Sequence, residues 1–180
     1  MKTIEELVSE VANNLGAQKS PEKPWTAQKN IISPKSEEKT VTYIKSEKIT
    51  LDIAKEVALA AETAAKEIGV KIVVSVCDEG ANLILLHAMD DSYIASVRAS
   101  QDKAYTAVAL KMPTHKALEE SRGGALDGLT NGNGILLLGG GFPLKGADKI
   151  YGGIGVSGGT KDEDTLIAAV AARYFNTRFK

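Results

Sequence analysis

The chain has 180 residues, of which 43% are hydrophobic and 25% charged, proportions that are ordinary for a soluble globular protein. Its net charge of −1 gives no reason to expect nucleic acid or an anionic membrane as a partner, and no apolar run is long enough to span a bilayer. The single cysteine, Cys77, excludes an internal disulfide and suits a reducing compartment, so we expect a cytoplasmic protein with one domain and an extension.

Residues 1–16 are expected to form a short amphipathic helix, with Thr3 and Glu6 at the spacing of a capping box. Residues 17–48 follow as a proline-punctuated linker, in which 40–46 suits an edge strand. So short a helix needs a surface against which to bury its apolar face, on its own domain, a sister subunit or another protein. The apolar face consists of Ile4, Leu7, Val8, Val11 and Leu15.

From residue 49 onward, helical and strand patterns alternate. The alanine-rich stretch 50–69 predicts a helix with Thr50 as its N-cap and Gly69 as its stop. Strands linked by hairpins, with helices before, between and after them, favour an antiparallel α+β sandwich. Further helices are predicted over 92–112, 114–123 and 162–175, and strands over 70–78, 83–89, 134–144 and 149–156.

The familiar catalytic and metal-binding motifs are missing from this sequence, including a Walker A loop, paired CxxC and HExxH. The two histidines, His87 and His115, lie in different predicted elements, so each is interpreted first as a structural or surface residue. Cys77 lies inside an apolar strand and is expected to be a small core residue. Lys103 lies on an alanine-rich helix, where a solvated lysine is the simplest interpretation.

The stretch VSGGT, residues 156–160, joins the last predicted strand to the last helix. Its glycines and the helix N-terminus have the form of an anion site. However, Asp162, Glu163 and Asp164 fill the first helical turn and would repel a phosphate, while Thr160 and Glu163 have capping-box spacing. We therefore favour a structural turn lining a subunit contact, with an anion cradle as the alternative.

Four motifs occur along the chain in the order VVSVCDEGANLILLHAMDD, ASQDKAYTAVALKMPT, GGGFPL and YGGIGVSGGTKDEDTLIAAVA. Together they resemble the GlcG/HbpS group, also called the haem-degrading or DUF336 family, which includes the C-terminal domain of PduO. The resemblance covers roughly residues 49–176. It implies a profilin-like α/β/α sandwich, with an antiparallel sheet of about five strands flanked by helices. It also implies dimers or higher oligomers, and haem or a related tetrapyrrole such as a corrinoid as the ligand.

Individual site residues follow from the same resemblance. Some haem-binding members carry an axial histidine on the first domain helix, but residues 50–69 contain none. His87, His115 or a ligand from a neighbouring subunit would then bind the iron, for which neutral imidazole is a usual protein ligand. The predicted cofactor-binding residues are Asp78, His87, Lys103, His115, Ser157 and Gly158.

The predicted function is that of an oligomeric ligand-binding accessory protein, with residues 49–180 as the binding domain. Residues 1–16 resemble the encapsulation peptides of bacterial microcompartment cargo, which implies a place inside such a compartment and partners among shell or cargo proteins. One alternative is a small-molecule enzyme that uses Asp78, Lys103 and Ser157 around an interface cleft. Another is a structural cargo adaptor that binds no ligand.

Overall fold

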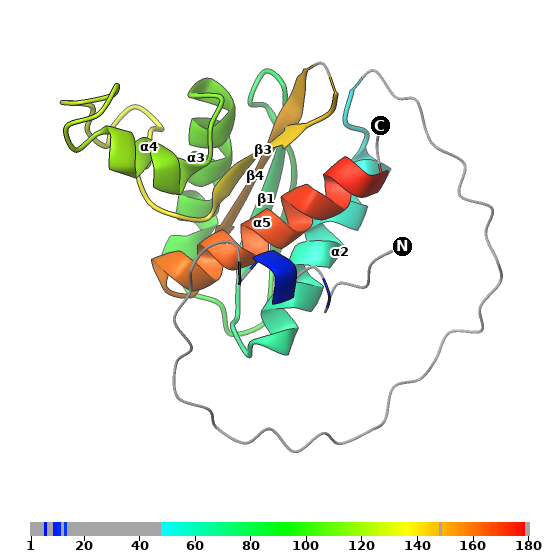
Figure 1. The fold of residues 1–180 in the computed structure, drawn as a ribbon. Helices are drawn as coiled ribbons and strands as arrows, with labels where there is room; N and C mark the ends of the chain where they lie inside the picture. Colours follow the sequence, from blue (N-terminus) through cyan, green and yellow to red (C-terminus); the bar gives the residue numbers. More distant parts are fainter. Residues whose placement is uncertain (1–5, 7–8, 12, 14–47, 148, 179–180) are drawn as a thin grey trace, which may run out of the picture.

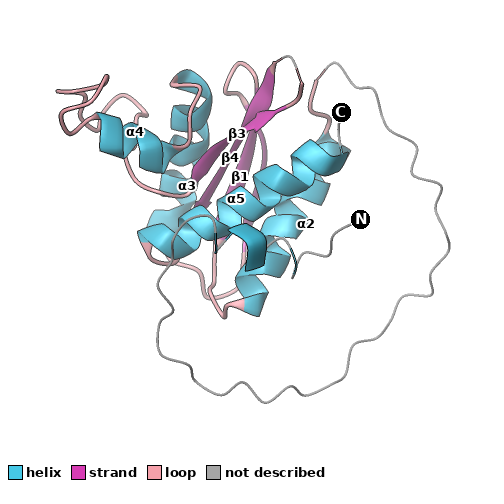
Figure 2. Cartoon of the chain, in the orientation of Figure 1, coloured by secondary structure: helices cyan, strands magenta, loops and turns pink. Residues whose placement is uncertain are grey.

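The computed structural model describes residue 6, residues 9–11, residue 13, and residues 48–147 and 149–178. Its middle layer is an antiparallel sheet with the strand order β2-β1-β4-β3 (Figures 1 and 2). The helices are α2 (Leu51–Glu67), α3 (Ile94–Ala109), α4 (Thr114–Glu120) and α5 (Lys161–Arg178). The strands are β1 (Val73–Asp78), β2 (Leu83–Ala88), β3 (Gly141–Lys145) and β4 (Ile150–Ser157).

The α+β sandwich expected from the sequence is confirmed, with helices on both faces of the sheet. Val74 and Val76 of β1 join one buried cluster with the alanines of α2 and the apolar residues of α5. The alternate residue Ser75 points to the other face, where its hydroxyl lies 2.8 Å from that of Ser100 in α3. Four strands are present among the described residues, and the predicted edge strand at 40–46 lies outside them.

Helix α3 packs directly on the backbone of β4. A Cβ atom at Gly155 would collide with the Ser100 carbonyl and would lie 2.6 Å from the Ala104 nitrogen. Glycine is therefore required here because the helix backbone occupies the space of a side chain. On the opposite face, alanines at the contact surface let α2 approach the sheet closely.

The predicted caps of α2 and α5 are confirmed. The Thr50 hydroxyl accepts a hydrogen bond from the Ile53 nitrogen at 3.3 Å, and Gly69 ends the helix with a φ of +74°. At α5, the Thr160 nitrogen donates to Glu163 Oε2 at 2.7 Å and the Glu163 nitrogen donates to Thr160 Oγ1 at 3.3 Å. This is the reciprocal bonding of a capping box.

The prediction that a strand covers residues 134–144 is wrong for its first half. Regular pairing begins only at Gly141, and the preceding residues form a loop with an isolated bridge from Gly132 to Ile135. The reason lies in the loop amides, which find side-chain partners instead of a neighbouring strand. The Leu136 nitrogen donates to Thr106 Oγ1 at 2.8 Å, and the Leu137 nitrogen donates to Asn131 Oδ1 at 2.7 Å.

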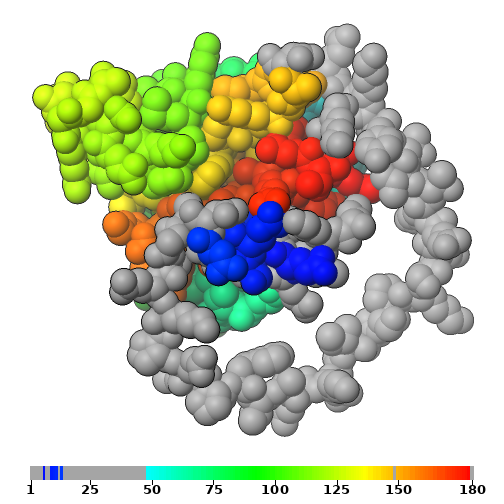
Figure 3. All heavy atoms as spheres, viewed as in Figure 1, coloured from blue at the N-terminus to red at the C-terminus, as the bar shows by residue number. Residues whose placement is uncertain are grey.

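The described residues near the N-terminus lie against α2 and α5 (Figure 3). Val11 is helical and buried in the core cluster, and Glu10 forms an ion pair with Arg173 of α5. Thr3 and most of the predicted apolar face lie outside the described residues. Among the helices that the structure describes, none has the length and hydropathy needed to cross a membrane.

Candidate functional site

Lys103 is completely buried, so its interpretation as a solvated lysine is wrong. Its ammonium group donates to Asp164 Oδ2 at 2.7 Å and to the Val156 carbonyl at 2.8 Å. The side chains of Lys103 and Asp164 are 0% and 3% exposed. Burial lowers the pKa of Lys103 and raises the pKa of Asp164, and their mutual attraction opposes both shifts. The pair links α3 to β4 and α5.

The glycines of the GGGFPL motif pack closely against this ion pair. A Cβ atom at Gly140, whose φ is +110°, would lie 3.0 Å from Lys103 Nζ and 2.9 Å from Asp164 Cβ. A Cβ atom at Gly141 would collide with the Lys103 carbonyl. The motifs therefore meet in a packed cluster that encloses the Lys103 ammonium group within the subunit.

Backbone amides of the VSGGT turn donate hydrogen bonds to carboxylates in the first turn of α5. The Gly159 nitrogen donates to Asp164 Oδ1 at 2.9 Å, and the Thr160 nitrogen donates to Glu163 Oε2 at 2.7 Å. Ser157 is buried, and Gly158 turns the chain against the carbonyl of Lys71. These contacts fit a structural turn better than an anion cradle, because two backbone amides of the turn are already bonded to carboxylates.

Asp78 organises the turn between β1 and β2. Its Oδ1 accepts hydrogen bonds from the Gly80 nitrogen at 2.9 Å and the Asn82 nitrogen at 2.8 Å. Burial alone would raise the pKa of Asp78, but the hydrogen bonds from Asn82 and Gly80 together lower it. Asp78 pairs with Gly152, whereas Ser157 pairs with Val73 at the other end of β1.

The residues of the alternative enzyme site are therefore apart within one subunit. Asp78 and Ser157 are separated by five residues along the sheet, about 16 Å at the rise of a β-strand. Lys103 lies near Ser157, but its ammonium group is enclosed by Val156 and Asp164.

The two histidines lie at opposite edges of the sheet. His87 on β2 has its Nδ1 2.8 Å from Glu62 Oε1 of α2, and 45% of its side chain is exposed. His115 on α4 packs on Phe142 of β3, with 5.5 Å between the ring centroids. Two strands separate β2 from β3, a distance of about 14 Å. One subunit therefore cannot bring both histidines to a single iron.

Glu62 is a candidate site residue that the sequence did not reveal. It is 25 residues from His87 and belongs to a different element, so no local motif joins them. His115 differs from His87 because its Nδ1 is buried without a hydrogen-bond partner among the described residues. Burial also lowers the pKa of His115, with Glu119 opposing the shift.

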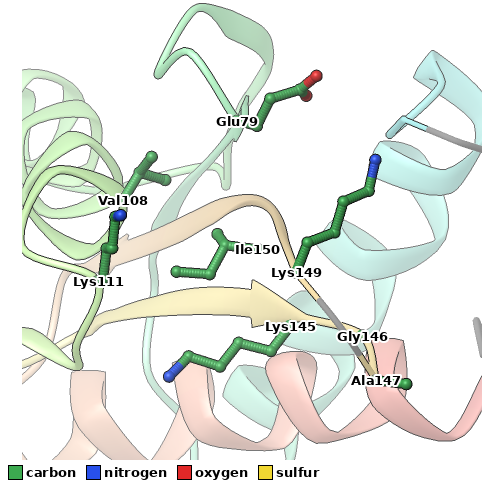
Figure 4. Close-up of a pocket in the computed structure, with 8 residues that line it drawn as sticks. All are labelled: Glu79, Val108, Lys111, Lys145, Gly146, Ala147, Lys149 and Ile150. Carbon is green, nitrogen blue, oxygen red and sulfur yellow. The ribbon is translucent and has the colours of Figure 1, made fainter.

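Two open pockets lie near the β1–β2 turn. The smaller, of about 300 Å³, is bordered by α3 and contains Cys77 and Tyr105. Burial raises the pKa of Cys77 to about 12, which excludes a reactive thiolate there at neutral pH. The larger, of about 620 Å³, is named here the lysine pocket (Figure 4). Its lining includes Glu79, Val108, Lys111, Lys145, Lys149 and Ile150.

No cluster of three or more His, Cys, Asp or Glu residues suited to a metal ion occurs in the part of the chain that the structure describes. Metal held directly by such a cluster is thus not indicated for these residues. A metal inside a macrocycle needs only one or two protein ligands, and a single exposed imidazole can supply one.

Comparison with known proteins gives consistent matches. The family model HbpS-like, described as haem degrading protein HbpS-like, matches residues 49–173. An uncharacterized 15.0 kDa protein from the dhaT-dhaS intergenic region of Citrobacter freundii is 44% identical over 131 residues, covering 71% of this chain and 92% of the relative. Corrinoid adenosyltransferase PduO of the same organism is 34% identical over 122 residues, covering 66% of this chain but only 36% of PduO.

Solved structures agree with these matches. Klebsiella pneumoniae protein ORFY has a TM-score of 0.66 at 38% identity, covering 74% of this chain and 97% of that one. The PduOC complex with haem has a TM-score of 0.64 at 31% identity, covering 69% of this chain and 94% of that one. A double mutant of Streptomyces reticuli HbpS has a TM-score of 0.66 at 28% identity, covering 84% of this chain and 98% of that one.

Proposed function

Because this chain belongs to the HbpS-like family, we propose that it binds haem or a related tetrapyrrole through His87, at the surface shared by α2 and β2. A structure of PduOC with haem supports this choice of ligand, since PduOC is 31% identical to this chain. The observation that carries the choice of residue is the contact between His87 and Glu62.

The Glu62 carboxylate gives the His87 imidazole the arrangement of a metal ligand. A carboxylate at 2.8 Å from Nδ1 favours the proton on that nitrogen and leaves the Nε2 lone pair available. Metal-binding histidines commonly have such a partner, which fixes the ring and increases its basicity. The 45% exposure of the side chain makes His87 accessible from solvent.

His115 is less suited to the same role. Its ring packs on Phe142, and its Nδ1 lacks the carboxylate partner that His87 has. By resemblance, some haem-binding members carry the axial histidine on the first domain helix. Here α2 has no histidine, but Glu62 of that helix holds His87 from the neighbouring strand.

An apolar residue lies beside the proposed ligand. Leu59 is 58% exposed and precedes Glu62 by three residues, so the two share a face of α2. Such a side chain would contact the flat apolar face of a tetrapyrrole. A macrocycle on this open surface would also be shielded by a second subunit, which links ligand binding to assembly.

Titration with haem tests this proposal. The wild type is expected to shift the Soret band, His87→Ala to lose the shift, and Glu62→Gln to bind about 10- to 100-fold more weakly. His115→Ala serves as the matched control and is expected to behave like the wild type. If the double variant His87→Ala/His115→Ala gives the same Soret spectrum as the wild type, neither histidine binds the iron and the proposal is wrong.

We also infer that the protein is at least a dimer. The outer face of α3 and its N-cap expose Tyr93, Ile94, Val97 and Tyr105, which are 71%, 91%, 37% and 40% exposed. Exposed apolar residues gathered on one face are typical of an interface. A second copy of this chain is the proposed occupant, and sedimentation showing only monomer at micromolar concentration would contradict it.

The N-terminal segment is proposed to direct the protein to a bacterial microcompartment, through shell or cargo proteins. The support is the resemblance of residues 1–16 to encapsulation peptides. The contacts of Glu10 and Val11 with the domain support a second role, in which the segment packs on its own subunit. The two roles are compatible if the docked segment is released to a partner.

A further inference from the structure

The lysine pocket concentrates positive charge on a chain whose net charge is −1. Its described lining contains three lysines and one glutamate, for a formal charge of +2. The residues come from three places: the end of α3, the turn after β1 and the hairpin between β3 and β4. Figure 4 shows the side chains of Lys111, Lys145 and Lys149 arranged around Ile150. The fold therefore brings Lys111, at the end of α3, together with Lys145 and Lys149 of the later β3–β4 hairpin.

The charges of Lys111 and Lys145 are not neutralised within the described structure. Neither lysine has a carboxylate oxygen within 4.0 Å among the described residues. Likewise, no cationic nitrogen of the described residues lies within 4.0 Å of the Glu79 carboxylate. Other lysines do have such partners: Lys103 pairs with Asp164 at 2.7 Å, and Lys55 with Asp52 at 3.5 Å. Among the described residues, Lys111 and Lys145 thus contribute positive charge to the pocket that no ion pair offsets.

Lys149 and Lys111 each have a second role within the fold. Lys149 Nζ lies 4.7 Å from the centroid of the Tyr151 ring, a cation–π contact that holds this lysine at the hairpin. Lys111 follows the C-terminus of α3, where a cation offsets the negative end of the helix dipole. Lys145 lies on a strand and has no such role, so its charge is the clearest sign of a ligand.

The rest of the pocket indicates the size and class of that ligand. A volume of about 620 Å³ is within the range of small-molecule sites. Val108 and Ile150 add apolar surface between the cations. Lysine acts as a point charge suited to phosphate and carboxylate, without the paired donors of arginine. We propose that the lysine pocket binds a small organic polyanion with two or more phosphate or carboxylate groups.

This site is distinct from the proposed tetrapyrrole surface. His87 pairs with Val74 on β1, whereas Glu79 follows the far end of that strand, five residues or about 16 Å away. The two proposals can therefore fail separately. The His87→Ala variant is expected to keep full polyanion binding.

Calorimetric titration of the full chain tests the proposal, with tripolyphosphate, citrate and inorganic phosphate as probes. At low ionic strength, tripolyphosphate or citrate is expected to bind at least about tenfold more tightly than phosphate, because more charges are engaged. The double variant Lys111→Gln/Lys145→Gln is expected to weaken binding of the tighter probe at least about tenfold. Tighter binding of tripolyphosphate would assign the phosphate class, and tighter binding of citrate the carboxylate class.

Two further variants make the test specific to the pocket. Glu79→Gln removes a negative charge from the rim and is expected to tighten binding about two- to fivefold. Lys55→Gln, outside the pocket, is the charge-matched control and is expected to change nothing. Equal weakening by Lys55→Gln, an unaffected double variant, or absence of saturable binding would each overturn the proposal.

Discussion

The ammonium group of Lys103 is stabilising only together with Asp164. A buried charge without its partner is costly, because its desolvation is no longer offset. The same ion pair joins residues 61 positions apart, so no local pattern in the sequence announces it. Burial of Cys77 and the cap at Thr50 were predictable because each depends on the immediate neighbours. Lys103 and Glu62 were not, since their partners come from other elements.

The first prediction at the scale of residues concerns this ion pair. Lys103→Met is expected to lower the free energy of unfolding by about 3–5 kcal/mol, because it leaves Asp164 buried and unpaired. Adding Asp164→Asn is expected to recover part of that loss, since asparagine can still accept from the Gly159 nitrogen. Denaturant unfolding measures both variants. A loss below about 1 kcal/mol in Lys103→Met would contradict the role given to the pair.

His115 gives a second prediction, in the response of stability to pH. Burial holds the pKa of His115 below 6.5, with Glu119 opposing and Lys116 assisting. The unfolded imidazole therefore takes up its proton first as the pH falls, so stability is complete above the unfolded pKa and declines below it until the folded pKa is passed. When the pH is lowered from about 7.5 to about 5.5, the melting temperature of His115→Gln is expected to fall less than that of the wild type. An equal loss would count against the buried neutral imidazole.

At the scale of elements, the contact between α3 and β4 depends on the absence of side chains. The sequence announced both elements through their periodicity, but not the face on which they meet. Likewise, the run 134–140 had the apolar composition of a strand, and its amides bond to Thr106 and Asn131 instead. Composition alone could not foresee partners that lie on a helix or in a loop.

Substitution of Gly155 tests this packing. Gly155→Ala is expected to destabilise the fold by about 3 kcal/mol or more, because the new methyl group meets helix backbone that cannot rotate away. Gly69→Ala is the control: a Cβ there meets nothing within 4 Å, so only the left-handed backbone conformation costs about 1 kcal/mol. Thermal and denaturant unfolding compare the two. Similar costs would show that α3 moves aside.

For the whole molecule, the ordered motifs in residues 49–176 were sufficient to predict the layered fold. They describe how the chain packs, since Lys103, Asp164 and the nearby glycines meet in its interior. They do not describe the surface, where relatives of the same fold can differ. The His87–Glu62 pair and the lysine pocket arise from surface positions that become neighbours only after folding.

The N-terminal segment provides the prediction at this scale. If residues 1–16 act as an address, deletion of residues 1–38 leaves the melting temperature and oligomer size unchanged. A fusion of residues 1–25 to a fluorescent protein then forms puncta in cells that make microcompartments. If the contacts of Glu10 and Val11 dominate instead, the truncated protein loses several degrees and the fusion is diffuse. The paired measurement separates targeting from folding.

The distance between Lys103 and Asp164 along the chain also bears on synthesis by the ribosome. Because 61 residues separate them, α3 emerges long before the carboxylate that will neutralise its lysine. Until the first turn of α5 has been translated, closing α3 onto the sheet would bury a charge with no counter-ion. A nascent chain stalled in this interval is therefore expected to keep α3 loose and open to proteases and chaperones.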